Sequence, residues 1–147
     1  MKVAGIDYGE VRIGVAISDP ERLIAFPLQT YVRSTPERDA EFFLSLVKDE
    51  QISQFVIGIP LHLSGDESEE SAEVLLFGSW LGNLTGLKID YFDERFTSVE
   101  AEKILRKAKL TDKKRKERRD MIAAQLILSA YLEAGCQGIS DYYDIND

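Results

Sequence analysis

The sequence contains few of the residues that form disulfides or zinc sites. Its one cysteine, Cys136, excludes an internal disulfide and fits a reducing compartment. Its one histidine, His62, has no cysteine or second histidine beside it, so there is no zinc signature. We therefore interpret His62 as an exposed loop residue. We interpret the acidic segment 66–73 as partners of a helix dipole and part of a solvated face.

Long apolar runs are also absent. No stretch is long enough to cross a membrane and no N-terminal signal pattern is present, so we expect a cytoplasmic protein without a membrane partner. The sequence has no repeat, low-complexity tract or interdomain linker. Its 147 residues, 44% of them hydrophobic and 30% charged, therefore predict one soluble domain with one proper core.

The charge of the chain is unevenly distributed. A net charge of −8 argues at face value against a nucleic-acid partner. Residues 106–119, however, contain nine lysines and arginines against two acids, which gives this stretch +7 and leaves −15 on the rest. Such a basic stretch can bind phosphates even on an acidic protein, and a solvated loop is the alternative. The candidate phosphate-binding residues within it are Lys113, Lys114, Arg115, Lys116, Arg118 and Arg119.

Apolar stretches alternate with capped, amphipathic ones in a pattern typical of an α/β protein. The first two predicted strands form a hairpin in which Gly9 supplies unusual backbone angles, and Gly14 marks a close approach of a ligand or backbone. Pro27 restricts the third strand to an edge or a bulge. Strands are predicted at 3–6, 12–17, 23–32, 55–59 and 88–92, and helices starting at Thr35-Pro36, within 66–73, at Thr97 and near Arg119, the last ending about Ala134.

Carboxylates stand where three of these elements begin or end. Asp7 ends the first strand, Asp93 and Glu94 follow the fifth, and Asp120 opens the last helix. On that helix Asp120 falls opposite a polar stripe that includes Gln125, so it should face the sheet. The alternatives are that Asp7 is a turn former bonded to nearby backbone, and that Asp120 is a dipole partner at a frayed helix end.

These carboxylates could share one locus, because functional sites of α/β sheets gather at strand ends. Three close carboxylates repel one another and need protons or cations between them. Ligand sets of oxygen alone select Mg²⁺ or Mn²⁺, and paired metals stabilise the attacking and leaving oxygens of a phosphodiester displacement. The basic stretch directly before Asp120 would deliver the substrate.

Four blocks in order resemble the YqgF family of Holliday junction resolvases and pre-16S ribosomal RNA nucleases. They are GIDYGEVRIGVAISD at 5–19, VIGIPLHLSGDES at 56–68, DERFTSVEAEKIL at 93–105 and RRDMIAAQLILSAYL at 118–132. The resemblance implies one RNase H-like nuclease domain over residues 1–147. Its fold would be α/β, with a five-stranded mixed sheet whose strands one to three are antiparallel and with helices on both faces.

The resemblance also implies roles for individual residues. Asp7, Glu94 and Asp120 match the family's catalytic carboxylates and would hold two Mg²⁺ or Mn²⁺ ions, although Asp93 could exchange roles with Glu94. The motif positions expected to contact phosphate are Arg12, Arg95 and Thr97. His62 departs from the family, which commonly has Asn there.

The implied function is a metal-dependent nuclease acting on structured nucleic acid, with processing of the 5′ end of pre-16S ribosomal RNA preferred. One alternative is a Holliday junction resolvase for four-way DNA, which would require a dimer; the sequence leaves monomer or homodimer open. A second is a non-catalytic RNA-binding ribosome assembly factor. A third is a nucleotide-binding module, since Asp7, Gly9 and Gly14 resemble the hairpin of actin-like ATPases, but that fold needs a longer chain.

Overall fold

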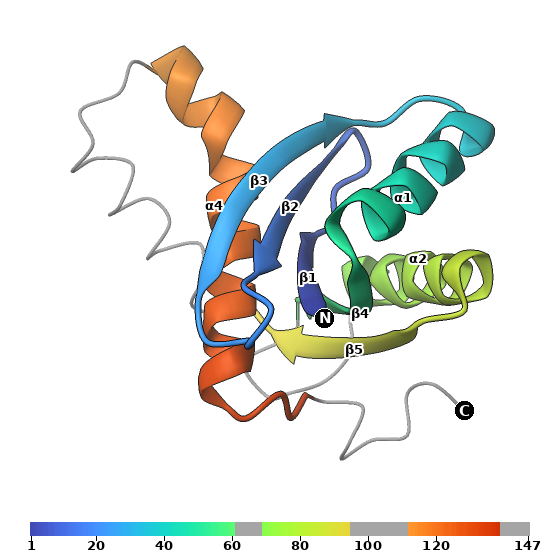
Figure 1. Ribbon diagram of the computed structural model, residues 1–147. Helices are drawn as coiled ribbons and strands as arrows, with labels where there is room; N and C mark the ends of the chain where they lie inside the picture. The colour runs from blue at the N-terminus through green and yellow to red at the C-terminus, as the bar shows by residue number, and fades with distance from the viewer. Residues whose placement is uncertain (61–68, 95–111, 139–147) are drawn as a thin grey trace.

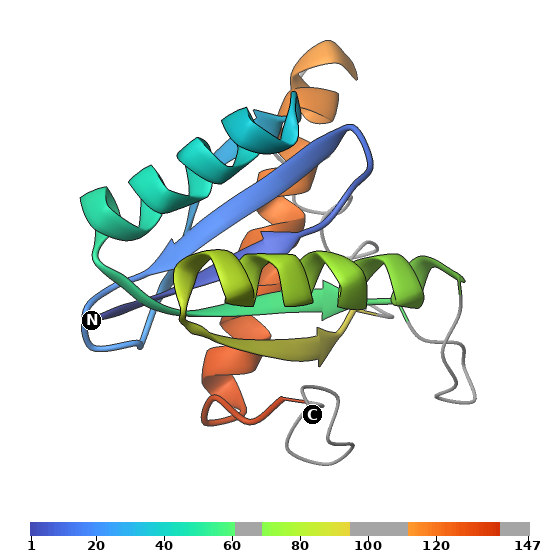
Figure 2. The same cartoon turned by 90° about the vertical axis from the view of Figure 1, so that its right-hand side faces the viewer.

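The computed structural model describes residues 1–60, 69–94 and 112–138, which form one sheet covered by helices on both faces (Figure 1). The strands run in the order β3-β2-β1-β4-β5. Figure 2 shows α1 and α2 on one face and α4 on the other. The strands are β1 (Lys2–Asp7), β2 (Arg12–Ser18), β3 (Ala25–Val32), β4 (Ile52–Ile59) and β5 (Lys88–Asp93), and the helices are α1 (Pro36–Glu50), α2 (Glu69–Thr85) and α4 (Asp112–Glu133).

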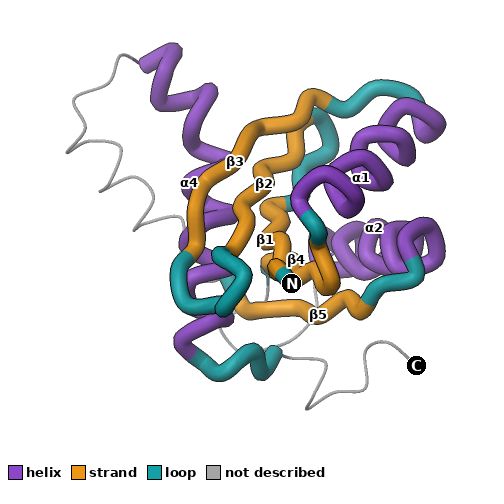
Figure 3. Tube along the Cα trace, viewed as in Figure 1, coloured by secondary structure: helices purple, strands orange, loops and turns teal. Residues whose placement is uncertain are grey.

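The pairing of the strands confirms the mixed sheet. Strand β2 lies antiparallel to both β1 and β3, whereas β4 lies parallel to both β1 and β5 (Figure 3). The carboxyl ends of β1, β4 and β5 therefore meet at one edge of the sheet. Asp7 and Asp93 are the last residues of β1 and β5, so the sheet itself brings the two predicted carboxylate segments to the same edge.

Strand β3 is an edge strand, as its proline predicted. Pro27 pairs with Ala16 next to a register shift in β2, so both the edge and the irregularity that proline favours are present. The strand begins at Ala25, two residues later than predicted. Leu23 and Ile24 instead lie in a turn, where their backbone N–H groups donate to Asp19 Oδ1 at 2.7 and 2.8 Å. Both side chains are apolar, which favoured the prediction of a strand, but both are exposed.

The sheet separates two apolar clusters. On one face α1 and α2 cover a cluster rich in aromatic rings, including Phe43 and Phe77, with Trp80 packed against it. On the other face α4 contributes Ala124, Leu128 and Tyr131 to a smaller cluster. Strand β4 is buried at seven of its eight residues, so both of its faces are covered.

Helix α4 begins at Asp112, so the predicted start near Arg119 is wrong. Lysine, arginine and glutamate are good helix formers, and the basic stretch needs no apolar anchor because these first turns extend past the sheet (Figure 1). Asp120 is consequently in the body of the helix. Gln125, which lies on the predicted polar stripe, donates from its Nε2 to the Ala25 carbonyl at 3.1 Å.

The hairpin between β1 and β2 uses its glycine differently from the prediction. Gly9 does not have a positive φ; the glycines that do, within the described residues, are Gly86 and Gly135. A Cβ at Gly9 would overlap the carbonyl oxygen of Arg12, so the glycine is needed for close approach across the turn.

None of the helices in the described ranges is both long and apolar enough to traverse a bilayer.

Candidate active site

Three carboxylates from distant parts of the chain influence one another at the carboxyl edge of the sheet. They are Asp7 at the end of β1, Glu94 directly after β5 and Asp120 on α4, and we call them the carboxylate cluster. Burial raises the pKa of Asp7 well above its usual range, and the negative charges of Glu94 and then Asp120 raise it further. The fold therefore brings together the three residues that the sequence singled out.

Asp7 does not act as a turn former. Within the described part of the chain, its carboxylate accepts no hydrogen bond from the backbone of Gly9 or Glu10, and burial and neighbouring charges alone determine its pKa shift. A largely buried carboxylate without hydrogen-bond donors is costly unless a proton or a cation neutralises it. The geometry thus disfavours the turn alternative and leaves Asp7 available to a cation.

Two glycines let the carboxylate cluster assemble. A Cβ at Gly14, which pairs with Asp7 across the sheet, would overlap the backbone carbonyl of Asp120, so α4 approaches β2 only because Gly14 has no side chain. This confirms the close approach expected at Gly14. A Cβ at Gly58 on β4 would likewise crowd a carboxylate oxygen of Glu94. This role of Gly58 was not predicted, because its one signal in the sequence is a glycine inside an otherwise apolar strand.

Of the two acids that follow one another after β5, Glu94 has the side chain that interacts with Asp7. Its backbone N–H donates to the Ile59 carbonyl at 3.3 Å, which continues the pairing of β4 with β5 by one residue. Burial raises the pKa of Glu94 to about 7, with smaller contributions from the charges of Glu70 and Asp93. The pattern DER could not distinguish Asp93 from Glu94, and the geometry favours Glu94.

Asp120 forms an ion pair with Arg12. The guanidinium Nε donates to Asp120 Oδ2 at 3.0 Å, with the Arg12 side chain 52% exposed and that of Asp120 19% exposed. Asp120 is the ninth residue of α4, so the prediction that it opens the helix is wrong, and with it the alternative that it caps a frayed end. The ion pair joins the start of β2 to α4.

An acidic cleft of about 220 Å³ adjoins the carboxylate cluster. Glu94 lines it together with Glu10 from the hairpin and Glu70 and Glu73 from α2. The charge of Glu10 is the largest cause that raises the pKa of Glu73. Glu69 and Glu70 lie in the first turn of α2, as the helix-dipole interpretation predicted. That interpretation did not predict that Glu70 and Glu73 also line the cleft.

The chemistry of the donor set fits a hard divalent cation. All members of the carboxylate cluster offer oxygen, the ligand that Mg²⁺ and Mn²⁺ prefer, and their mutual repulsion is what a cation would offset. Across residues 1–60, 69–94 and 112–138, no three acidic, histidine or cysteine side chains already converge closely enough to hold one ion.

The predicted phosphate-binding residues fall into three groups. Arg12 lies at the carboxylate cluster, and the exposed Lys114, Arg118 and Arg119 lie on the first turns of α4. Lys113, Arg115 and Lys116 belong to the same helix. Arg95 and Thr97, and also His62, lie outside the described residues.

Comparisons with known proteins agree with this architecture. Two bacterial relatives bear the name "Putative pre-16S rRNA nuclease". The one from Rhodopirellula baltica is 49% identical over 133 residues, covering 90% of this chain and 77% of the relative. The one from Koribacter versatilis is 39% identical over 132 residues, covering 90% and 86%.

Solved structures resemble the fold at low sequence identity. Thermus thermophilus RuvC in complex with a Holliday junction substrate is 15% identical with a TM-score of 0.53, and the match covers 92% of this chain and 96% of that one. The fowlpox virus resolvase with Holliday junction DNA is 12% identical with a TM-score of 0.57, covering 93% and 100%. These likenesses confirm the RNase H-like fold. A family model described as "RuvX: Holliday junction resolvase" matches residues 1–134, and the chain therefore belongs to the RuvX family.

Proposed function

We propose that this protein is a divalent-metal-dependent nuclease that hydrolyses phosphodiester bonds of structured nucleic acid, with the 5′ end of pre-16S ribosomal RNA as its preferred substrate. The observation that carries the proposal is the carboxylate cluster, in which Glu94 and Asp120 both raise the pKa of the largely buried Asp7. Repulsion within such a cluster destabilises the folded state, and metal-assisted hydrolysis is a function that requires these carboxylates. The names of the bacterial relatives support the choice of RNA.

In this proposal Asp7, Glu94 and Asp120 are the catalytic residues and metal ligands. Two bound Mg²⁺ or Mn²⁺ ions would lower the pKa of the attacking water and stabilise charge on the leaving oxygen. The three carboxylates fix where that chemistry takes place, because they come from a rigid sheet edge and a packed helix. They must be ionised to bind a cation, so the raised pKa of Glu94, about 7, predicts weaker metal binding as the pH falls below that value.

The cationic side chains would position the substrate. Arg12 is half exposed beside Asp120 and can exchange that carboxylate for a phosphate oxygen, since guanidinium groups bind phosphate well. Lys114, Arg118 and Arg119 are exposed on the turns of α4 that extend past the sheet. Contacts of this kind position the backbone of a nucleic acid without reading its sequence.

A second candidate is resolution of Holliday junctions, which the description of the family favours. That reaction cuts two strands at matched positions, so it requires two active sites in a dimer. The third candidate, an RNA-binding assembly factor without catalysis, is disfavoured because the carboxylate cluster would then only destabilise the fold.

Cleavage of matched substrates tests the proposal. A labelled precursor 16S ribosomal RNA end and a four-way DNA junction are incubated with Mg²⁺, Mn²⁺ or EDTA, using wild type, Asp7→Asn and, as a control, Glu41→Gln on the exposed face of α1. We expect metal-dependent RNA cleavage that Asp7→Asn abolishes and Glu41→Gln retains. Cleavage of the junction alone would move the assignment to a resolvase. Binding without any cleavage would overturn the nuclease in favour of the assembly factor.

A further inference from the structure

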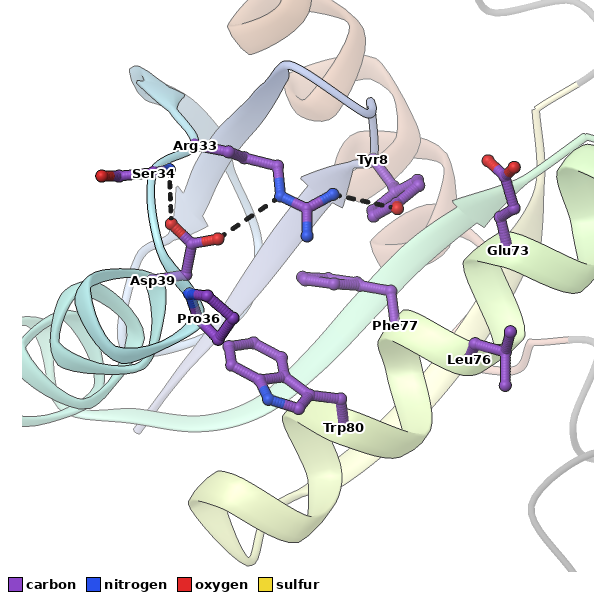
Figure 4. Close-up of a pocket in the computed structure, with 9 residues that line it drawn as sticks. All are labelled: Tyr8, Arg33, Ser34, Pro36, Asp39, Glu73, Leu76, Phe77 and Trp80. Carbon is purple, nitrogen blue, oxygen red and sulfur yellow. Dashed lines mark hydrogen bonds and ion pairs between the residues drawn. The ribbon is translucent and has the colours of Figure 1, made fainter.

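A second cavity, of about 390 Å³, opens between the start of α1 and the middle of α2 (Figure 4). We call it the aromatic pocket. It lies on the face of the sheet that α1 and α2 cover, next to the end of β1. Its lining residues are Tyr8, Arg33, Ser34, Pro36, Asp39, Glu73, Leu76, Phe77 and Trp80. A cavity of this size and composition is typical of small-ligand sites.

Aromatic rings and one guanidinium group form most of its walls. The rings of Phe77 and Trp80 lie 5.7 Å apart at 32°, and the Tyr8 ring lies 4.8 Å from that of Phe77. The Arg33 guanidinium lies over the Tyr8 ring, 5.3 Å from its centroid. Unpaired nucleobases stack on surfaces of this kind, on aromatic rings and on the planes of arginine guanidinium groups.

Arg33 is held in place and still has a donor to spare. Its Nε donates to Asp39 Oδ2 at 3.5 Å, and its Nη1 donates to the Tyr8 hydroxyl at 3.0 Å and the Gly9 carbonyl at 3.4 Å. In the part of the chain that the structure describes, its Nη2 has no hydrogen-bond partner. A donor fixed in this way loses little conformational freedom when a ligand binds.

Glu73 supplies an exposed acceptor at the rim of the pocket (Figure 4). Together with Asp39 it makes the pocket unfavourable for a phosphate group. A purely apolar side chain from a protein partner would leave the free donor of Arg33 unpaired, which is costly once it is covered. A neutral, planar group with both N–H donors and acceptors at its edge matches these walls best.

The aromatic pocket shares two lining residues with the acidic cleft that adjoins the carboxylate cluster. Tyr8 directly follows Asp7, the last residue of β1, and both Tyr8 and Glu73 line the acidic cleft that Glu94 also lines. A strand whose phosphate lies at the carboxylate cluster can therefore place a nearby base in the pocket.

We propose that the aromatic pocket binds one unpaired guanine of the nucleic-acid strand that is cut at the carboxylate cluster. This inference rests on the proposed nuclease function. Guanine carries O6 and N7 acceptors for Arg33 Nη2 and N–H donors at N1 and N2 for Glu73, whereas adenine and uracil each lack part of that pattern. The base stacks on the aromatic rings, so the pocket selects where an unpaired strand is held.

Trp80 makes the pocket directly observable, because it is the chain's single tryptophan. Its fluorescence is followed while short uridine-rich RNA strands with one central guanine, one central adenine or uridine alone are added, in EDTA so that no cleavage occurs. We expect quenching of Trp80, with the guanine strand binding about tenfold more tightly than the adenine strand. Unchanged fluorescence on binding, or equal affinity for guanine and adenine, would overturn the proposal.

A pair of variants isolates the role of Glu73. Glu73→Ala and Glu69→Ala remove the same charge from the same helix, but Glu69 lines neither the pocket nor the cleft. We expect Glu73→Ala to lose the preference for guanine and Glu69→Ala to keep it; identical behaviour of the two would refute the assignment. Because RNA that is cut in Mg²⁺ without quenching Trp80 would refute only the guanine site, failure of the inference is distinguishable from failure of the nuclease proposal.

Discussion

Replacing Glu94 by glutamine should stabilise the metal-free protein. Glu94 is largely buried beside Asp7, and burial together with the charges of Glu70 and Asp93 raises its pKa from 4.5 to about 7. The folded state therefore holds the proton more tightly than the unfolded chain. Below about pH 4 the group is protonated in both states and costs nothing. As the pH rises through the interval from 4.5 to about 7, that stability is lost.

The size of this loss follows from the shift. One pKa unit corresponds to about 1.4 kcal/mol, so a rise from 4.5 to about 7 corresponds to about 3 kcal/mol of destabilisation once Glu94 is ionised. Solvent screening of a carboxylate that lines an open cleft reduces this value, so we expect Glu94→Gln to gain about 1 to 3 kcal/mol at about pH 8. A chain of this size should then unfold at a temperature about 3 to 9 °C higher.

Urea unfolding in EDTA at a series of pH values measures this gain. The free energy of unfolding of Glu94→Gln minus that of wild type should be near zero at about pH 4 and should grow through the titration interval. Glu41→Gln, on the exposed face of α1, serves as the matched control and should show no such dependence. A variant that is less stable than wild type at high pH, or a difference independent of pH, would refute the electrostatic account of the carboxylate cluster.

Three further substitutions test other parts of the structure. Gly14→Ala forces a Cβ against the Asp120 backbone, so it should cost about 3 kcal/mol in urea unfolding and abolish cleavage; near-wild-type behaviour would contradict the close approach of α4. Tyr131→Phe removes the hydroxyl that donates to Asp90 Oδ2 at 2.8 Å in the core. It should lower the free energy of unfolding by about 1 to 3 kcal/mol in the same assay. An unchanged urea midpoint would show that this hydrogen bond does not stabilise the fold. Arg12→Gln should change the free energy of unfolding by less than about 1 kcal/mol, because the ion pair of Arg12 is half exposed. It should nevertheless weaken RNA binding and lower the salt dependence of the binding constant by about one ion. An unchanged salt slope would argue against a phosphate contact.

The fold was predictable because its strands carry strong local signals. Strand β4 is apolar on both faces, and Pro27 marks β3 as an edge strand through the one hydrogen bond it cannot make. The boundary of β3 was predicted less accurately, because apolar residues occur there within a turn. Leu23 and Ile24 are apolar but lie in a turn fixed by the Asp19 carboxylate, which no apolar pattern reveals.

The candidate site was predictable only in part. Asp7 ends a core strand, where a carboxylate is unusual unless a partner or a ligand stabilises it. The parallel arrangement of β1, β4 and β5 brings the ends of these strands together. The choice of Glu94 over Asp93 depends on the space above Gly58, which is a tertiary property. The aromatic pocket could not be predicted, because Trp80 and Arg33 line one cavity only after α2 packs beside the start of α1.

The central claim is that Asp7 and Glu94, rather than Asp93, form a metal-dependent catalytic site. Single-turnover cleavage of a precursor 16S ribosomal RNA end in Mg²⁺ tests it most directly, using wild type, Asp7→Asn, Glu94→Gln and the neighbouring control Asp93→Asn. We predict that Asp7→Asn and Glu94→Gln each lose about a thousandfold or more in rate while retaining RNA binding, and that Asp93→Asn stays near wild type. Cleavage that survives Asp7→Asn, or that is lost equally in Asp93→Asn, would contradict the account.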